Sequence, residues 1–236
     1  MRPEDDALLA DVEAATERLL ATVRRFADAD LAAPSLCPGW TRGHVLAHVS
    51  RNADALVRLV TWAASGIETP MYPSPEVRAA DIEAGARRPV AEQLSDLETS
   101  AAALSDALRG LPDECFAAMV RIGVRDVPAS AIIPARQLEV EMHHVDLDAG
   151  YAPDDWPEQF TSRALPFVLE RVTAAPGDAA FTVAVPGGDD VVVGRPGGPR
   201  VSGPVGDLVA WLFGRGDRGR LRVEPDAPLP TPPPWH

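Results

Sequence analysis

The sequence contains no lysine, and all 22 of its basic residues are arginine. This absence excludes Schiff-base chemistry and a phosphate-binding P-loop, because both depend on a lysine amine. With 35 acidic residues the formal net charge is −13, which argues against binding to nucleic acids or to anionic membranes. An anionic substrate must therefore be held by arginine, whose planar guanidinium pairs well with carboxylates.

Cysteine and long apolar runs are also scarce. Cys37 and Cys115 are too few for a disulfide framework or a cysteine zinc site. No apolar run could span a bilayer, and residues 2–6, with one arginine and three acids, do not form a secretory signal. A reduced cytoplasmic setting, without nucleic-acid or membrane partners, is the simplest interpretation, and we expect a monomer.

Apolar residues recur at helical spacing through the first 150 residues. The pattern predicts four helical regions, over residues 4–29, 41–65, 75–108 (with a break at 85–89) and 128–149. Thr41 is the expected N-terminal cap of the second region and Gly150 the expected C-terminal cap of the last. Four helices with short connections predict an antiparallel bundle, a scaffold that often builds metal sites from facing side chains.

The pattern changes after Gly150, where β-rich runs follow one more helix. A P-G-G-D turn at 186–189 between two such runs is typical of a hairpin. We expect helices at 154–173 and 204–213, and strands at 181–185, 191–193, 200–202 and 221–223. The predicted fold class is therefore α+β, with a helical bundle (1–152), a small α+β domain (153–224) and a proline-rich tail (225–236).

Two histidine-bearing segments of the bundle indicate a metal site. His48 lies in the second helical region, and Glu139 and His143 lie four residues apart in the last one, on one helical face. Two imidazoles and one carboxylate leave a divalent ion with an open coordination position, which favours catalysis. We therefore predict His48, Glu139 and His143 as ligands of a divalent metal ion.

Other readings of these residues remain open. A single histidine on a half-buried helix is often only a packing residue, and His44, one turn before His48, could form a ligand pair with it. Cys37 could supply a fourth ligand, although a small buried residue is the simpler interpretation.

The last helix of the bundle offers two polar faces. Glu139, His143 and Asp146 share a face with apolar residues, so we expect this face to point into the bundle. The other face is expected to be solvated and carries three polar residues, Glu141, His144 and Asp148.

Three segments resemble a known family. Residues 38–56, PGWTRGHVLAHVSRNADAL, closely resemble the N-terminal signature of the mycothiol-dependent maleylpyruvate isomerases, which belong to the DinB-like metal-binding helical bundles. Residues 136–147 are similar to the family stretch R-x-x-E-V-x-x-H-x-x-D-L. Residues 206–215, GDLVAWLFGR, are similar to its C-terminal helix ending in W-L-x-G-R, within a sterol-carrier-like α+β domain. Similarity elsewhere in that domain is weak.

The resemblance implies roles for individual residues. It implies His48, Glu139 and His143 as metal ligands, with Zn²⁺ as the expected ion and mycothiol as the thiol cofactor. It also suggests Arg215 at the active site, where a guanidinium would pair with a substrate carboxylate or a developing enolate. Apart from the family resemblance, the simpler interpretation of Arg215 is a cation at a helix C-terminus. Its interaction with the helix dipole would stabilise the fold by about 0.3–1 kcal/mol.

Four further residues are candidates on position alone. Arg51 and Asn52, one turn beyond His48, either face the thiol cofactor or make contacts within the bundle. Asp146, and similarly His44, would hydrogen-bond to a metal ligand and so fix its orientation. For Asp146 the alternative is an ordinary surface aspartate of a helix, which is nearly as common.

The expected reaction is the cis–trans isomerisation of maleylpyruvate to fumarylpyruvate. A metal-held thiolate would add to the cis double bond, the resulting single bond would rotate, and elimination would release the trans product. Two alternatives stay open: a mycothiol S-transferase that detoxifies electrophiles, and a non-catalytic metal-binding or regulatory protein.

Overall fold

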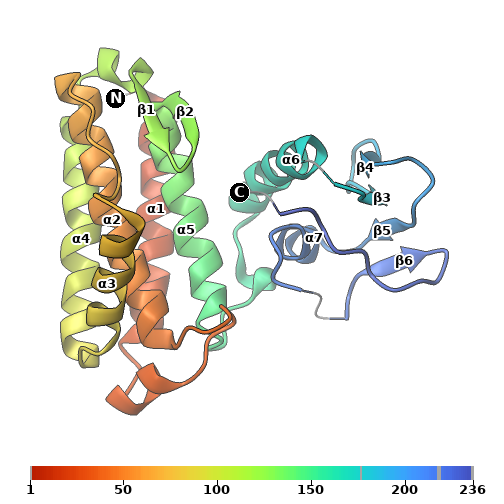
Figure 1. The fold of residues 1–236 in the computed structure, drawn as a ribbon, viewed down its shortest axis with the longest axis horizontal. Coiled ribbons are helices and arrows are strands. Elements are labelled where there is room, and N and C mark those ends of the chain that lie inside the picture. The colour runs from red at the N-terminus through yellow and green to blue at the C-terminus, as the bar shows by residue number, and fades with distance from the viewer. Residues whose placement is uncertain (1, 176, 217–218, 235–236) are drawn as a thin grey trace. The chain divides into compact units, whose positions relative to one another are not determined.

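A computed structural model describes residues 2–175, 177–216 and 219–234 of the chain. The chain divides into two compact units, Met1–Gly150 and Tyr151–His236. The first unit is mainly helical and the second combines helices with a sheet (Figure 1). The predicted α+β class is therefore confirmed.

The described part of the first unit contains five α-helices and one hairpin. The helices are α1 (Pro3–Val23), α2 (Arg42–Ser65), α3 (Pro75–Ala86), α4 (Val90–Gly110) and α5 (Ile132–Asp146). Helix α2 contacts α3, α4 and α5, and α1 packs against α4 and α5 (Figure 1). The antiparallel strands β1 (Met119–Ile122) and β2 (Arg125–Pro128) precede α5. Short 3-10 turns at Asp28–Ala32, Asp113–Ala117 and Ala129–Ala131 complete the connections.

The core of this unit lies along α2. Its residues Leu46, Leu56 and Leu59 are almost fully buried, within two apolar clusters that also receive residues of α1, α4 and α5. Burying one leucine stabilises a fold by about 1.5–3 kcal/mol. Helix α2 is therefore held on several sides, which gives His48 a rigid base.

The ends of α2 follow the sequence signals. Thr41 is extended and precedes the helix, and its backbone N–H donates to His44 Nδ1 at 3.2 Å. His44 thus occupies the place that a glutamate takes in a capping box. Gly66 ends the helix in a left-handed conformation with φ of 71°, which glycine adopts without strain.

Two glycines let α3 approach α2 closely. A Cβ added to Gly43 would lie 2.6 Å from the carbonyl oxygen of Ala86, and one added to Gly85 would lie 2.8 Å from Cβ of Ala47. Both distances are shorter than normal contacts, so larger residues would push the two helices apart. This close packing places α3 beside the N-terminal half of α2, where His48 lies.

The stretch before α5 differs from the sequence expectation. The predicted helix over 128–149 is shorter, because residues 125–128 form β2 and a 3-10 turn follows. Gly150 is not the cap: the helix ends at Asp146, and Arg42 of α2 donates to the carbonyl oxygens of Leu147 and Asp148 at 2.7 and 2.6 Å. A side chain from another helix therefore binds the first two carbonyls beyond the end of α5.

The second unit packs helices on a small mixed sheet. Its elements are α6 (Glu158–Ala174), β3 (Ala180–Val183), β4 (Val191–Gly194), β5 (Arg200–Ser202), α7 (Val205–Leu212) and β6 (Arg222–Glu224). The strand order is β4-β3-β5-β6; β3 and β5 are parallel, and the other neighbouring pairs are antiparallel. Phe181 of β3 packs on Trp211 of α7, with ring centroids 5.1 Å apart. The helices and strands follow the predicted order.

The C-terminal tail lies against the second unit. Residues 225–234 contain no helix or strand, but Trp211 Nε1 donates to the carbonyl oxygen of Pro230 at 2.9 Å. None of the described helices is long and apolar enough to cross a membrane.

Candidate metal centre

His48, Glu139 and His143 converge between α2 and α5. His48 Nε2 lies 3.1 Å from Glu139 Oε2, and His143 Nε2 lies 3.4 Å from the same oxygen. The two imidazole rings meet edge to face, with centroids 4.7 Å apart. The three side chains thus offer one ligand atom each, all within 4.8 Å of one another.

These separations fit a divalent cation. Ligands about 2.0–2.1 Å from a tetrahedral zinc ion lie about 3.3 Å apart, close to the two measured contacts. His48 is buried, whereas the Glu139 side chain keeps 33% of its surface exposed. The donor set therefore suits a catalytic ion with one position left for a small molecule.

The electrostatic surroundings set the protonation states of Glu139 and His48. Burial works to raise the pKa of Glu139, but hydrogen bonds from His143 and His48 outweigh it and hold that pKa well below its usual value. Burial lowers the pKa of His48. The cluster therefore presents an ionised carboxylate beside a neutral His48 imidazole, the forms that bind a metal.

Asp146 and Cys37 lie behind His143. Asp146 is buried, and its Oδ2 lies 2.8 Å from His143 Nδ1 and 3.3 Å from the Cys37 thiol. Although burial opposes protonation, contacts with Asp146, Cys37 and Glu139 raise the pKa of His143 well above its usual value. Without an ion the His143 ring is therefore protonated on both nitrogens; an ion at Nε2 would displace the proton there, while Asp146 would keep the proton on Nδ1, as behind many metal-bound histidines.

Cys37, His143 and Asp146 also form a compact group of their own, with ligand atoms within 4.8 Å of one another. This group shares His143 with the first cluster and uses the opposite side of its ring. Because one neutral imidazole offers a single lone pair, we assign Cys37 to the support of Asp146 rather than to a ligand role.

Arg78 and Trp40 lie behind His48. Arg78 Nη2, from α3, is 3.2 Å from His48 Nδ1, and the Trp40 ring centroid is 5.4 Å from that of His48. Sequence reasoning missed Arg78. Its contact depends on how α3 packs on α2, and a single arginine in an amphipathic helix carries no signal of that packing.

His44 does not join the cluster. Its Nδ1 interacts with the Thr41 hydroxyl at 2.8 Å, and its Nε2 lies 3.0 Å from Glu83 Oε2. The alternative pair of His44 and His48 as joint ligands therefore has no geometric support, and His44 ties α3 to the start of α2.

Arg51 and Asn52 have partners within the bundle. Arg51 pairs with Asp96 of α4 at 2.5 Å, and the buried Asn52 accepts a hydrogen bond from Arg136 Nη1 at 2.8 Å. These contacts match the bundle alternative for the two residues; their binding of a thiol stays a prediction.

The expectation for the second polar face of α5 was wrong. Glu141 has no exposed surface and accepts from Arg18 Nη2 at 2.6 Å, and the buried His144 lies 2.8 Å from the Thr22 hydroxyl. Both partners come from α1, which packs on this face. Only Asp148 is exposed as expected.

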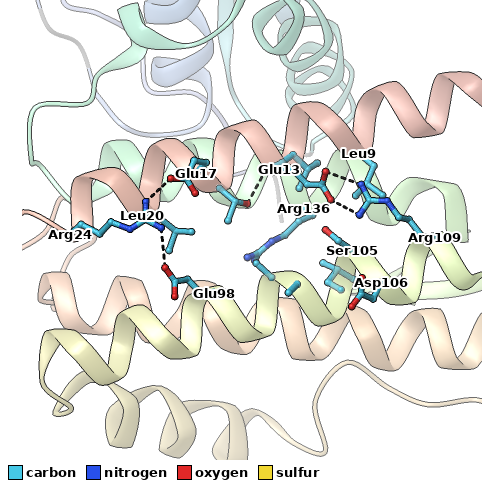
Figure 2. Close-up of a pocket in the computed structure, with 15 residues that line it drawn as sticks. Leu9, Glu13, Glu17, Leu20, Arg24, Glu98, Ser105, Asp106, Arg109 and Arg136 are labelled. Atoms are coloured by element: carbon cyan, nitrogen blue, oxygen red, sulfur yellow. Dashed lines mark hydrogen bonds and ion pairs between the residues drawn. The ribbon is translucent and has the colours of Figure 1, made fainter.

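A groove of about 440 Å³ lies between α1 and α4, and the residues of the metal cluster do not line it (Figure 2). Two ion pairs cross it, Arg24 with Glu98 and Arg109 with Glu13, and Arg24 also pairs with Glu17 of α1. Arg136 lies in its wall, where burial lowers the guanidinium pKa to about 10. Among the described residues, the groove contains no group of three potential metal ligands, in contrast to the cluster.

Arg215 lies in the second unit, directly after α7. Its backbone N–H donates to the carbonyl oxygen of Ala210, and its Nη1 donates to that of Phe213 at 3.0 Å. These contacts match a residue that ends a helix. A part for Arg215 in substrate binding stays a prediction.

Comparison with known proteins supplies the family. Residues 12–148 match the model of the mycothiol maleylpyruvate isomerase N-terminal domain, and residues 155–234 match that of the MDMPI C-terminal domain. The chain belongs to the mycothiol-dependent maleylpyruvate isomerase family. The resemblance of the three sequence segments is thereby confirmed.

Solved structures agree with this assignment. A crystal structure of the mycothiol-dependent maleylpyruvate isomerase is 30% identical in sequence, with a TM-score of 0.89, and the match covers 98% of this chain and 97% of that one. A structure of a mutant of that isomerase, 29% identical over the same shares, has the same TM-score. No curated protein matches the chain. The chain is thus assigned to a family of enzymes, and the non-catalytic alternative is set aside.

Proposed function

We propose that the protein is a metal- and mycothiol-dependent isomerase that converts maleylpyruvate to fumarylpyruvate. The observation that carries this proposal is the convergence of His48, Glu139 and His143 at separations suited to a divalent ion, Zn²⁺ in our proposal. The name of the similar crystal structure supports the substrate and the thiol.

His48, Glu139 and His143 would hold the ion, and a three-ligand set would allow a thiol sulfur to bind as well. A bound divalent ion would lower the pKa of the mycothiol thiol, so that the thiolate can add reversibly to the cis double bond and leave again after rotation. Addition turns the double bond into a single bond, and elimination restores it in the trans form. The thiol is regenerated, so no oxidant or reductant is consumed.

The protein's own groups prepare this site. Asp146 holds the His143 ring in place through Nδ1, so that Nε2 faces Glu139 and His48. Trp40 packs on the His48 ring and limits the access of water on that side. Arg215, through its guanidinium, would pair with a carboxylate of the substrate.

Metal analysis with an ultraviolet assay tests the proposal. Purified protein should carry about one divalent ion per chain, and mycothiol with maleylpyruvate should yield fumarylpyruvate. His143→Gln should lose both the ion and the activity. The matched control His144→Gln changes the adjacent residue on α5, which faces Thr22, and should keep the ion.

Three results would contradict the proposal. Retention of the ion by both His48→Ala and His143→Gln would reject the ligand set. Full activity after removal of the ion by a chelator would reject the metal dependence. Formation of mycothiol conjugates with alkylating agents, without isomerisation, would favour the S-transferase.

A further inference from the structure

Arg78 is a cation at the metal cluster that has no acidic partner among the described residues. It is half-buried on α3, and among the described residues its guanidinium contacts His48 Nδ1 at 3.2 Å and the Tyr72 ring, 5.4 Å from the ring centroid. No ion pair joins it to a carboxylate of the described residues, in a chain with 35 acids and 22 arginines. Its charge is therefore not neutralised by a neighbouring side chain.

The contact with His48 depends on which ring nitrogen carries the proton. Glu139 lies 3.1 Å from Nε2 and, as a carboxylate, only accepts, so Nε2 donates. Nδ1 of the neutral ring is then an acceptor, which suits Arg78 because a guanidinium only donates. The three groups thus form one consistent chain of hydrogen bonds from Arg78 through His48 to Glu139.

This chain is incompatible with His48 as a metal ligand through Nε2. When Nε2 gives its lone pair to a cation, the neutral ring carries its proton on Nδ1. Nδ1 and Arg78 Nη2 would then be two donors facing each other at 3.2 Å, with a further positive charge nearby. Arg78 must therefore leave His48 when the ion binds.

We propose that Arg78, released from His48 when a divalent ion binds, is the carboxylate-binding residue contributed by the first unit to this site. The inference rests on the proposed function, because it needs the ion on His48. A guanidinium binds a carboxylate through two parallel hydrogen bonds, and the proposed substrate carries carboxylates. Arg78 is thus a specificity residue, distinct from Arg215 of the second unit.

The surroundings of Arg78 suit this change of partner. The face of Tyr72 supports the guanidinium by a cation–π contact that does not depend on His48. Helix α3 is seated tightly on α2 through Gly43 and Gly85, so the backbone of Arg78 stays beside the cluster while its side chain moves. Only side-chain rotation is then needed for release.

The first test measures metal affinity and does not depend on any measurement of enzyme activity. We would titrate metal-free protein with Zn²⁺ against a chromophoric chelator and compare wild type with Arg78→Ala and Arg78→Gln. Arg78→Ala should bind Zn²⁺ about 3- to 10-fold more tightly, because no guanidinium has to be displaced. Arg78→Gln should bind at least as tightly as Arg78→Ala, because its carbonyl oxygen can accept from Nδ1 of the metal-bound ring.

The opposite result is equally clear. If Arg78 merely supported the ligand from behind, its loss would weaken Zn²⁺ binding by about 10- to 100-fold. A weakening of that size, or an unchanged affinity, would overturn the proposed release of Arg78. Absence of Zn²⁺ binding in the wild type would instead reject the proposed function itself.

Maleate, a stable cis-dicarboxylate, gives the second test. Its binding to protein loaded with Co²⁺ can be followed by the visible spectrum of the ion. Arg78→Ala should weaken maleate binding roughly 10- to 100-fold, and Arg78→Lys should recover part of it. Arg109→Ala, which removes an arginine paired with Glu13 on the distant groove, should leave it unchanged. Equal maleate binding by wild type and Arg78→Ala would overturn the carboxylate role.

Discussion

The two polar faces of α5 carry the same residue types for different purposes. On one face Glu139 and His143 meet His48; on the other, Glu141 and His144 meet Arg18 and Thr22. The second set is complete, since the carboxylate has a guanidinium and the imidazole has a hydroxyl. The first set brings three ligand atoms together with no guanidinium on Glu139 among the described residues. The kind of partner, more than burial, therefore separates the proposed ion site on one face from the ion pair with Arg18 on the other.

The largest effect on metal affinity is expected when Glu139, the carboxylate on the face of α5 that meets His48, is replaced by a neutral side chain. Glu139→Gln keeps the size of the side chain but replaces an anionic ligand by a weak one, so Zn²⁺ affinity should fall by more than about 100-fold. Competition with a chelator measures this directly. An unchanged affinity would remove Glu139 from the ligand set and make the two faces alike.

The complementary substitution on the structural face should act on stability. Glu141→Ala removes the carboxylate that pairs with Arg18, and breaking a buried ion pair costs about 3–5 kcal/mol. Because the Arg18 side chain is 35% exposed, we expect the low end, about 3 kcal/mol of unfolding free energy in urea melts. Zn²⁺ stoichiometry should stay at that of the wild type; its loss would show that the faces are not independent.

A smaller effect on metal affinity is expected when the contact between Asp146 and the proposed ligand His143 is weakened. Asp146→Asn keeps an oxygen near His143 Nδ1 but removes its charge, so Zn²⁺ affinity should fall about tenfold. The same titration measures it, with Cys37→Ala as a control that removes only the thiol next to Asp146. Equal affinity in wild type and Asp146→Asn would reduce Asp146 to a packing residue.

The last effect concerns the pH dependence of stability. Burial, with the nearby cations Arg18 and Arg25, lowers the pKa of His144 to about 3. Its unfolded pKa is about 6.5, so below that pH only the unfolded chain takes up the proton, and stability is lost as pH falls from 6.5 toward 3. The slope approaches about 1.4 kcal/mol per pH unit.

Metal-free wild type and His144→Gln should therefore diverge in this window. Unfolding free energies at pH 7.5, 6 and 5 should fall less steeply for the variant, whose amide does not titrate. Parallel curves would mean that His144 is protonated in the folded state, against the burial seen beside Thr22.

Much of the bundle could be predicted from local signals. Thr41 and Gly66 mark the ends of α2, and the four-residue spacing of Glu139 and His143 places them on one face of α5. These features depend on backbone preferences and helix periodicity, which are properties of short segments. The convergence with His48 followed because two helices of one bundle share a core.

Other features depended on packing between distant segments. The burial of Glu141 and His144 requires α1 on that face, and a solvated and a buried ion pair look alike in sequence. The two carbonyls just beyond α5 bind the side chain of Arg42, more than a hundred residues earlier, and no local pattern predicts this contact. The β1–β2 hairpin was missed because its strands mix charged residues and a proline with apolar ones and show no β-rich run.

The glycines between α2 and α3 have a consequence for engineering of this enzyme. Gly85 sits about two helical turns from Arg78 on the same helix, and nothing larger fits against Ala47. A methyl group at Gly85 would act as a wedge, tilting α3 and changing how far the guanidinium reaches. Substitution of Gly85 would thus change the preference among substrates of different length, although Gly85 itself does not contact the substrate. It would act by shifting α3 and not by altering a direct contact.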